Sequence, residues 1–353
     1  MKTVTVNASQ TYEVKVGRGL LADLGKEIAP RMGKGRAVCL VSDSNVANLY
    51  LDAAQESLED AGLRVEPFVM FAGEIHKNVR TYAKLLDYMA ENQITRADAL
   101  VALGGGVVGD LTGFAAATYL RGVGFFQVPT TLLAAVDASV GGKTAVDLDA
   151  GKNLAGALYQ PRLGLCDLNT LDTLPDDIFA DGCAEVIKYG MIGDPDLLDK
   201  LETIDFRADP EAIVARCIEM KRDLVEADEF DTGARQLLNL GHTMGHGIEA
   251  CSDYGISHGK AVAIGLTMAA RTAIAHGLCP GEVLPRLIAL LEQYHLPTAT
   301  DYTVEALYDR VLADKKRAGE TQTLVMPTAW GKSELHQVPV RELRDWIQKG
   351  LTL

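Results

Sequence analysis

The stretch ALVALGGGVVGD, residues 99–110, carries the clearest indication of fold class in this 353-residue chain. Its first five residues form an apolar run typical of a buried strand, and three consecutive glycines follow directly. Gly104, Gly106 and Gly109 spell G-x-G-x-x-G where a strand passes into a helix, and a helix N-terminus in that position can bind a pyrophosphate. The stretch therefore predicts a strand–turn–helix unit of a dinucleotide-binding sheet.

The segments on both sides of this stretch alternate between strand and helix patterns. Helix-like spacing covers roughly 46–61 and 73–93, and residues 2–6 and 12–16 alternate like the strands of a hairpin. The other strand-like runs lie at 37–41, 64–70 and 123–129. This alternation predicts an α/β, Rossmann-like domain with a parallel sheet over residues 1–172.

The pattern changes near LDTLPDD (171–177), where the proline and the acids suit the start of a helix. Helix-like segments then dominate, and only 323–327 and the residues around Glu334 look extended. The helix-like segments are 176–192, 194–204, 210–228, 235–251, 258–276, 281–294 and 303–313. We expect a second, mainly α-helical domain over residues 173–353.

Composition limits the classes of partner. Apolar residues make up 48% and charged residues 23%, and the net charge of −14 argues against nucleic acid or an anionic membrane. No apolar run has the length of a membrane span. The N-terminus lacks an apolar signal core, and the six cysteines are scattered without a CxxC motif. These features predict a cytoplasmic protein with reduced cysteines.

The glycine loop has an unusual acidic partner. Dinucleotide-binding sheets usually carry an acid at the end of the strand that follows the loop, where it binds the adenosine ribose. Here that strand ends in QVPT (127–130), and an acid, Asp43, ends an earlier strand instead. A glycine-rich turn that binds nothing is the alternative. The three consecutive glycines together with Asp110 favour nucleotide binding.

Lysines lie among glycines in VDASVGGKTAVDLDAGKN (136–153), which contains Asp137, Lys143, Lys152 and Asn153. The segment lacks the first glycine of a phosphate-binding P-loop at the required spacing, so it is not that motif. Glycine backbone beside lysine still suits a phosphate or a carboxylate. The alternative is a solvated loop.

Three histidines form a candidate metal site. His242 and His246 are four residues apart, so on a helix they share one face, and His258 follows in a turn-like segment. Upstream, Glu185 and Lys188 stand three apart among apolar neighbours, either as a simple ion pair or as a metal ligand beside a substrate lysine. From these residues alone, metal binding and ordinary polar helix positions remain equally open.

The ordered motifs resemble the 3-dehydroquinate synthase family, whose members are sugar phosphate cyclases, over nearly the whole chain. The matching motifs are SDSNV, GEIHKN, GGGVVGDLTGFAAATYLRGV, QVPTTLLAAVDASVGGKTAVD, GKNLAG, LDTLP, AEVIKYG, EADEFDTGARQLLNLGHTMGHGIEA, SHGKAVAIG and DKKR. The resemblance implies a dinucleotide-binding domain followed by a metal- and substrate-binding domain, and a homodimer.

The resemblance also implies roles for individual residues. One divalent metal, Zn²⁺ or Co²⁺, would bind Glu185, His242 and His258, and His246 would contact substrate instead of metal. The implied NAD-contacting residues are Asp43, Asn45, Glu74, Lys77, Gly105, Gly106, Asp110, Thr130, Thr131, Asp137, Lys143, Lys152 and Thr173. The implied substrate-contacting and catalytic residues are Asp137, Lys143, Lys152, Asn153, Lys188, Lys221, Arg235, Asn239, His246 and Lys315 or Lys316, with Arg121 reaching the partner's site in a dimer.

The implied reaction converts 3-deoxy-D-arabino-heptulosonate 7-phosphate into 3-dehydroquinate and phosphate, a step of the shikimate pathway in aromatic amino-acid biosynthesis. In this family a transient oxidation by NAD precedes phosphate elimination, re-reduction and an intramolecular aldol closure. The substrate is a small anionic sugar phosphate, so the implied lysines and arginines make a locally basic pocket in an acidic chain.

Two segments depart from the family pattern. Lys260 stands where the family usually has Glu, and Asp231 replaces a common Glu near the substrate. The alternatives are a cyclase that makes 2-deoxy-scyllo-inosose or a valiolone-type product, a polyol dehydrogenase of the same fold, and an inactive NAD-binding regulator. Lys221, Asn239 and His246 match dehydroquinate synthase at positions where the other cyclases differ, and the metal ligands and Lys143 that an inactive regulator would lack are present.

Overall fold

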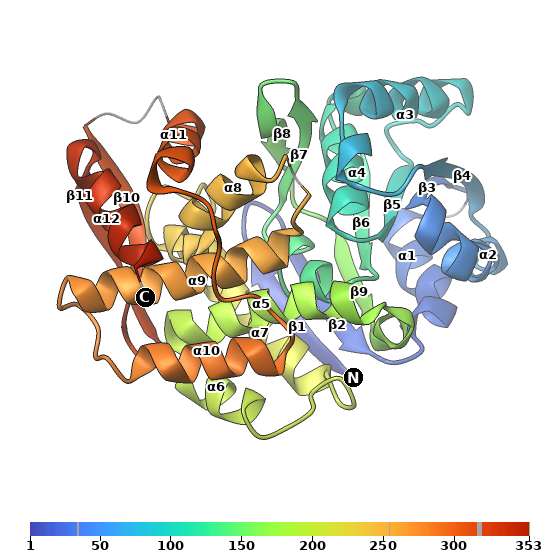
Figure 1. Ribbon diagram of the computed structural model, residues 1–353. Helices are drawn as coiled ribbons and strands as arrows, with labels where there is room; N and C mark the ends of the chain where they lie inside the picture. The colour runs from blue at the N-terminus through green and yellow to red at the C-terminus, as the bar shows by residue number, and fades with distance from the viewer. Residues whose placement is uncertain (34, 254, 316–319, 353) are drawn as a thin grey trace. The chain divides into compact units, whose positions relative to one another are not determined.

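The computed structural model describes residues 1–33, 35–253, 255–315 and 320–352, without the side chains of 313–315. The chain forms two compact units (Figure 1). The first contains residues 1–174 and 210–230, and the second contains residues 175–209 and 231–353. The division thus falls after Leu174 and not after residue 172, and a segment within the expected second domain joins the first unit.

A seven-stranded sheet forms the centre of the first unit, in the order β1-β2-β9-β6-β5-β3-β4. Neighbouring strands run parallel except β1 and β2, which form the expected antiparallel hairpin. The strands are β1 (Lys2–Asn7), β2 (Thr11–Gly17), β3 (Ala37–Asp43), β4 (Arg64–Met70), β5 (Ala99–Gly104), β6 (Gly124–Pro129) and β9 (Leu163–Asp167). The predicted parallel α/β sheet is confirmed.

Helices cover both faces of this sheet. On one face α1 (Leu24–Met32) and α2 (Ser44–Asp60) bury leucines and Ile28 against the strands. On the other, α3 (Val79–Glu91) and α4 (Gly106–Thr118) pack against Cys39, Val41 and their neighbours. Because β3 and β5 lie in the middle of the sheet, their side chains are buried on both faces, which explains their continuous apolar runs. Short helical turns complete the unit: η1 (Leu20–Asp23), η2 (Glu74–His76), η3 (Tyr119–Arg121), η4 (Ala134–Ala138) and η5 (Leu168–Thr173).

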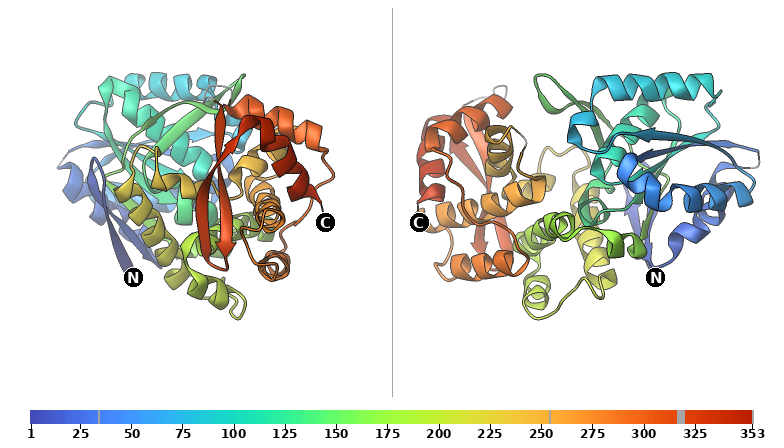
Figure 2. Two further views of the ribbon diagram at one scale, coloured as in Figure 1. Left: turned by 90° about the vertical axis from the view of Figure 1, so that its left-hand side faces the viewer. Right: turned by 45° about the vertical axis from the view of Figure 1, so that its right-hand side comes forward.

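Several parts of the first unit differ from expectation. The lysine-containing segment is not a loop: it forms the hairpin of β7 (Lys143–Leu148) and β8 (Gly151–Leu158), which stands beside α4 (green in Figures 1 and 2). The helix expected from residue 73 begins only at Val79, where Asn78 accepts hydrogen bonds from two backbone amides. The helix α7 (Glu211–Ala227) packs on β1 and so belongs to the first unit.

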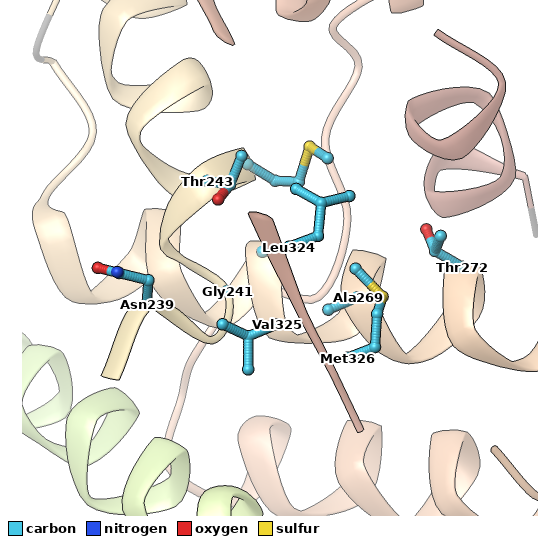
Figure 3. A pocket seen from close by; sticks show the side chains of 10 residues that line it. Asn239, Gly241, Thr243, Ala269, Thr272, Leu324, Val325 and Met326 are labelled. Carbon is cyan, nitrogen blue, oxygen red and sulfur yellow. The ribbon is translucent and has the colours of Figure 1, made fainter. Parts of the chain in front are cut away.

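The second unit is mainly helical, as expected, and α9 (His258–Ala275) packs against several of its other elements. The remaining elements are α5 (Asp176–Gly193), α6 (Pro195–Leu201), η6 (Ala234–Asn239), α8 (His242–Cys251), α10 (Val283–Gln293), α11 (Val304–Lys315), β10 (Thr321–Ala329), β11 (Lys332–Pro339), η7 (Val340–Glu342) and α12 (Leu343–Leu351). Figure 3 shows Leu324, Val325 and Met326 of β10 near Gly241 and Ala269. Of the helices in the described part of the chain, none has the length and apolar character to cross a bilayer.

The segment expected as one helix over 235–251 is broken. It forms the short helix η6 and then α8, which starts at His242 after a left-handed Gly241 with φ of 76°. A left-handed residue ends one helical run and redirects the next. The break therefore makes His242 the first residue of α8, where its ring can point away from the helix.

Candidate active site

The glycine loop joins β5 to α4 with little space for side chains. Gly105 is the N-cap of α4. A Cβ atom on Gly104 would lie 2.6 Å from Val108, and one on Gly109 would lie 2.9 Å from Gln127. Thr130 donates its backbone N–H to the carbonyl of Gly104 at 3.0 Å, which ties the end of β6 to the loop. The backbone amides at the start of α4 thus form a surface suited to a diphosphate.

A cluster of charged side chains surrounds Lys77, which is only 4% exposed. Its Nζ lies 2.8 Å from Glu74 and 3.2 Å from Asp110. Lys152 also approaches Glu74, with 3.8 Å between Nζ and Oε1. Asp147, which sequence reasoning missed, donates its backbone N–H to the Lys77 carbonyl and accepts a hydrogen bond from the backbone of Asn153. The structure therefore brings β7, β8 and η2 together around one buried ammonium group.

Burial and charge shift the pKa values in this cluster. Burial disfavours the charged form of Lys77, yet Asp110 and Glu74 hold its pKa above the usual value. Burial raises the pKa of Asp110 to about 6, with Lys77 opposing the shift. Lys77 is therefore a permanent cation near neutral pH.

Other residues expected at NAD are distributed around the same end of the sheet. Asp43 ends β3 and caps α2 through hydrogen bonds from the backbone of Asn45 and Val46. Thr131 accepts a hydrogen bond from the backbone of Ala134. Thr173 is exposed, and its hydroxyl lies 2.5 Å from that of Tyr50. Since β3 neighbours β5, the unusual acid at the end of an earlier strand lies next to the strand of the glycine loop.

Lys221 of α7 and Asp137 of η4 form a buried pair. The Nζ of Lys221 contacts the Asp137 carboxylate and donates to the Asp137 backbone carbonyl at 2.6 Å. Lys221 is 6% exposed, so its ammonium group is largely removed from water. Hydrogen bonds to charged groups are the strong ones, and two of them fix this lysine. Through this contact, α7 places an expected substrate residue, Lys221, in the first unit.

In the second unit, helices α5, α8 and α9 meet through glycines that allow close backbone approach. A Cβ on Gly259 would lie 2.1 Å from the carbonyl oxygen of Asp181 in α5. A Cβ on Gly265 would lie 2.0 Å from the carbonyl oxygen of Gly241. Asp181 also accepts hydrogen bonds from Ser257 Oγ and the Lys260 backbone at the start of α9. These contacts fix the first residue of α9, His258, against α5.

Glu185, His242 and His258 form the candidate metal centre, each from a different one of these helices. Each offers a ligand atom, and the three atoms lie within 4.8 Å of one another. The Nε2 atoms of His242 and His258 are both 3.4 Å from Glu185 Oε1. Two ligand atoms about 2.1 Å from a tetrahedral cation lie about 3.4 Å apart. The spacing therefore fits one small divalent cation.

The environment of Glu185 supports this fit. The carboxylate is fully buried, and within the described part of the chain no atom meets hydrogen-bond geometry at either oxygen. Lys188 places its Nζ 2.5 Å from Oε2. A buried carboxylate that is flanked by two imidazoles and one ammonium group, with no hydrogen bond of good geometry from a described residue at either oxygen, is well placed to bind a cation. The donor set of one oxygen and two nitrogens suits zinc and similar metals.

The pKa values of the two candidate histidine ligands shift in opposite directions. Burial lowers the pKa of His242 to about 4, so its ring is neutral and ready to bind a cation. Burial disfavours the charged ring of His258, but the nearby carboxylates of Glu185 and Glu249 raise its pKa to about 10. Although burial opposes its ionisation, Lys188 and His242 hold the pKa of Glu185 well below its usual value. Cation binding would thus displace a proton from His258.

The expected substrate residues are placed as follows. His246 is exposed on α8, with its ring 5.5 Å from that of His242 and 6.0 Å from that of His258. Arg235 is 1% exposed in η6, and Asn239 ends that helix. In the first unit, Lys143, Asn153 and Arg121 are exposed, and the last two have positive φ. Lys315 ends α11 with its side chain outside the described part, as is all of Lys316.

Comparison with known families gives two matches, which together span residues 67–317. Residues 67–181 match the family described as 3-dehydroquinate synthase N-terminal, and residues 182–317 match the one described as 3-dehydroquinate synthase C-terminal. The chain belongs to the 3-dehydroquinate synthase family.

Relatives that carry this family's name match almost end to end. A 3-dehydroquinate synthase of Streptococcus suis is 40% identical, covering 98% of this chain and 99% of the relative. One of Pelobacter propionicus is 46% identical and covers 90% of each chain. These matches confirm the resemblance that the ordered motifs indicated.

Solved structures of cyclases share the fold. A 2-deoxy-scyllo-inosose synthase in complex with carbaglucose-6-phosphate, NAD⁺ and Co²⁺ superimposes with a TM-score of 0.87 at 26% identity, covering 99% of this chain and all of that one. A 2-epi-5-epi-valiolone synthase from Streptomyces hygroscopicus superimposes with a TM-score of 0.88 at 24% identity and 98% coverage of each chain. The butanol dehydrogenase of Thermotoga maritima reaches a TM-score of only 0.66 at 15% identity, with 96% of each chain covered. The dehydroquinate synthase-like fold is confirmed.

Sequence reasoning missed three acids that the structure places beside expected residues of this dehydroquinate synthase family member. Asp147 lies at the Lys77 cluster, Asp181 holds the start of α9, and Glu249 contacts His258. Glu249 had a detectable signal, since it stands seven residues after His242 and seven residues span nearly two helical turns. The other two depend on contacts between elements that sequence spacing does not reveal.

Proposed function

We propose that this chain is a 3-dehydroquinate synthase that converts 3-deoxy-D-arabino-heptulosonate 7-phosphate into 3-dehydroquinate and phosphate. The observation that carries the proposal is the Glu185, His242 and His258 cluster with Lys188 beside it, in a chain 40–46% identical to named synthases. Three protein ligands leave cation positions open for a substrate, as a catalytic centre requires.

Two groups take part in the proposed reaction. NAD would be held by the start of α4 and the Lys77 cluster, and the cation by Glu185, His242 and His258. When bound, NAD supplies a hydride acceptor that is restored within the turnover, and the cation supplies a Lewis acid that lowers the pKa of the substrate hydroxyl.

The chain's own residues bind the substrate and move protons. Lys188, Lys221 and Arg235 bind its carboxylate and phosphate by charge-assisted hydrogen bonds. Lys188 and Arg235 are almost fully buried, so little water competes for their charges. His246, exposed beside the cluster of Glu185, His242 and His258, accepts the proton of the hydroxyl that is oxidised, because histidine is the most common general base in enzymes.

The test is a phosphate-release assay with the proposed substrate and NAD at a concentration far below that of substrate. A synthase releases many equivalents of phosphate per NAD without accumulating NADH, and the carbocyclic product is 3-dehydroquinate. Stoichiometric NADH would identify a polyol dehydrogenase instead. Release of phosphate only from glucose 6-phosphate would identify a cyclase of the scyllo-inosose type. No turnover of either substrate, with NAD binding intact, would favour the inactive regulator.

Three further features belong to the proposal. The active form is a homodimer in which Arg121 reaches the partner's site, the resident metal is Zn²⁺ or Co²⁺, and the protein works in the cytoplasm. Arg121 lies in a turn of three consecutive positive-φ residues and is exposed, which supports the first feature because a partner subunit could contact this side chain.

A further inference from the structure

The His258 ring has a second contact besides the one with Glu185. Its Nδ1 lies 3.2 Å from Glu249 Oε2, while its Nε2 lies 3.4 Å from Glu185 Oε1. Glu249 is 2% exposed, so water competes little for this contact. A carboxylate that accepts a hydrogen bond from one ring nitrogen holds the proton there and leaves the other nitrogen as the ligand atom.

We propose that Glu249 is a positioning residue for the metal centre, which fixes the ring of His258 with Nε2 toward the cation. The inference rests on the proposed function, because it assigns a role toward the cation that Glu185, His242 and His258 would hold. Glu249 contacts neither substrate nor cofactor in this role and acts only through His258.

His242, the other candidate histidine ligand, has a comparable contact at Nδ1, made to a backbone carbonyl instead of a carboxylate. The Nδ1 of His242 lies 3.1 Å from the backbone carbonyl oxygen of Leu240, and its Nε2 faces Glu185. Both imidazoles thus have an oxygen acceptor at Nδ1 and present Nε2 to the same carboxylate oxygen. The left-handed Gly241 makes the Leu240 contact possible, because it turns the chain back at the start of α8.

One helix supplies both a ligand and an orienting group. Glu249 follows His242 by seven residues on α8, so the two lie on nearly the same face, two turns apart. His258 lies at the start of α9, which packs along α8. The Glu249 contact therefore links the helix that carries one ligand to the first residue of the helix that carries another.

A competing role for Glu249 is direct ligation of a second cation. His246, Glu249 and His258 also offer three ligand atoms within 4.8 Å of one another. The contact between Glu249 and His258 Nδ1 favours positioning, because a cation at that nitrogen would replace the hydrogen bond. The two roles predict different cation stoichiometries, which an experiment can separate.

The experiment measures Co²⁺ binding to the metal-stripped full chain, without substrate or turnover, by competition with a chelator and by the visible absorption of bound Co²⁺. The variants are Glu249→Gln, which keeps the shape and a weaker acceptor, and Glu249→Met, which removes the acceptor. We expect one equivalent of Co²⁺ in each case, with affinity about 10- to 100-fold weaker in Glu249→Gln and weaker still in Glu249→Met. The absorption band should shift as the His258 ring loses its fixed orientation.

The matched control is Asp194→Asn, which changes another buried carboxylate of the same unit into an amide. Asp194 caps α6 through the backbone of Leu197, and asparagine serves equally well in that position, so Co²⁺ affinity should stay within about twofold. Unchanged affinity and spectrum in both Glu249 variants would overturn the inference and leave the proposed function intact. Loss of a second Co²⁺ equivalent with the first retained would overturn it in favour of direct ligation. A wild-type chain that binds no Co²⁺ would overturn both, which distinguishes the two failures.

Discussion

The carboxylate of Glu185 shows how much of the chemistry depends on a single residue. It is buried from water, 3.4 Å from two imidazole nitrogens and 2.5 Å from an ammonium group. Leaving such a charge partly compensated is costly, so the site is stabilised when a cation occupies it. The same residue thus couples the stability of the second unit to its proposed catalysis.

Substitution of the histidines should separate ligation from proton transfer. We expect His258→Ala to lose its metal on dialysis, because one of three ligands is gone. His246→Ala should keep the metal and lose activity by about 10²- to 10⁴-fold, the usual contribution of a general acid or base. Metal analysis and phosphate release on the same preparations decide the matter. Full metal occupancy in His258→Ala, or a metal-free His246→Ala, would show that the ligand assignment is wrong.

Asp110 should give the NAD-free protein a distinct pH dependence. Burial raises its pKa to about 6 from an ordinary value of 3.8, with Lys77 opposing, so the folded state binds this proton more tightly than the unfolded chain. The resulting stabilisation is present below about pH 4 and is lost as the pH rises through 6. The melting temperature of wild type relative to Asp110→Asn should therefore fall across this interval. A constant difference would mean that Asp110 titrates alike in both states.

The residues of the candidate site were only partly predictable from sequence. Recognisable spacings in the sequence connect Glu185 with Lys188 and His242 with His246, and His258 follows shortly after. The structure brings all five residues together in one unit. The spacing of Glu249 from His242 is visible in the sequence, but its contact with His258 is not, since that contact depends on how α9 returns along α8. The Lys221–Asp137 pair joins positions 84 residues apart and likewise depends on tertiary structure.

At the scale of elements, the site depends on the close approach of α8 and α9. A Cβ atom on Gly265 would lie only 2.0 Å from the carbonyl oxygen of Gly241, the residue before α8. Because this neighbour is backbone, a side chain on Gly265 can be accommodated only if one helix moves. The ligands His242 and His258 each begin one of these helices, so a shift of either helix changes their separation.

Gly265→Ala should therefore damage both stability and metal binding. We expect a loss of about 1–3 kcal/mol or more in the free energy of unfolding, typical of overpacking, together with weaker Co²⁺ affinity. Denaturant unfolding and chelator competition measure the two effects. Gly281→Ala is the matched control, since a Cβ there meets nothing within 4 Å, and it should change neither quantity. Equal behaviour of the two variants would contradict the role of the helix contact.

Most elements were predictable, and the exceptions have physical causes. The apolar runs at β3, β5 and β6 identified the sheet because central strands are buried on both faces. The β7–β8 hairpin was missed because its second strand is largely exposed and carries glycines and a lysine, which resemble a loop. The break between η6 and α8 was missed because Gly241 sits within an otherwise helical apolar pattern.

At the scale of the whole molecule, the candidate NAD and metal residues divide between the two compact units. Glu185, His242 and His258 all lie in the second unit, whereas the glycine loop and the Lys77 cluster lie in the first. A ligand that binds only the folded state stabilises the unit that holds it. The metal should therefore stabilise the second unit, and NAD should stabilise the first.

Removal of the metal should affect the second unit selectively. We expect chelation to increase amide hydrogen exchange in α5, α8 and the start of α9, with little change in β3, β5 and α4. Addition of NAD should protect the glycine loop and η2 and leave α8 unchanged. Hydrogen–deuterium exchange with mass spectrometry resolves these segments. Uniform changes throughout the chain on chelation would indicate global destabilisation and contradict ligation by these three residues.

The course of α7 has a consequence for how the protein is made. The chain passes from the first unit to the second after Leu174, returns for residues 210–230 and leaves again. The helix that packs on β1 and supplies Lys221 is therefore synthesised after α5 and α6 of the other unit. A nascent chain that ends at residue 174 contains every strand of the seven-stranded sheet but lacks α7, the helix that packs on β1. The first unit can thus reach its native state only after a portion of its neighbour has left the ribosome, so the two units cannot mature strictly one after the other.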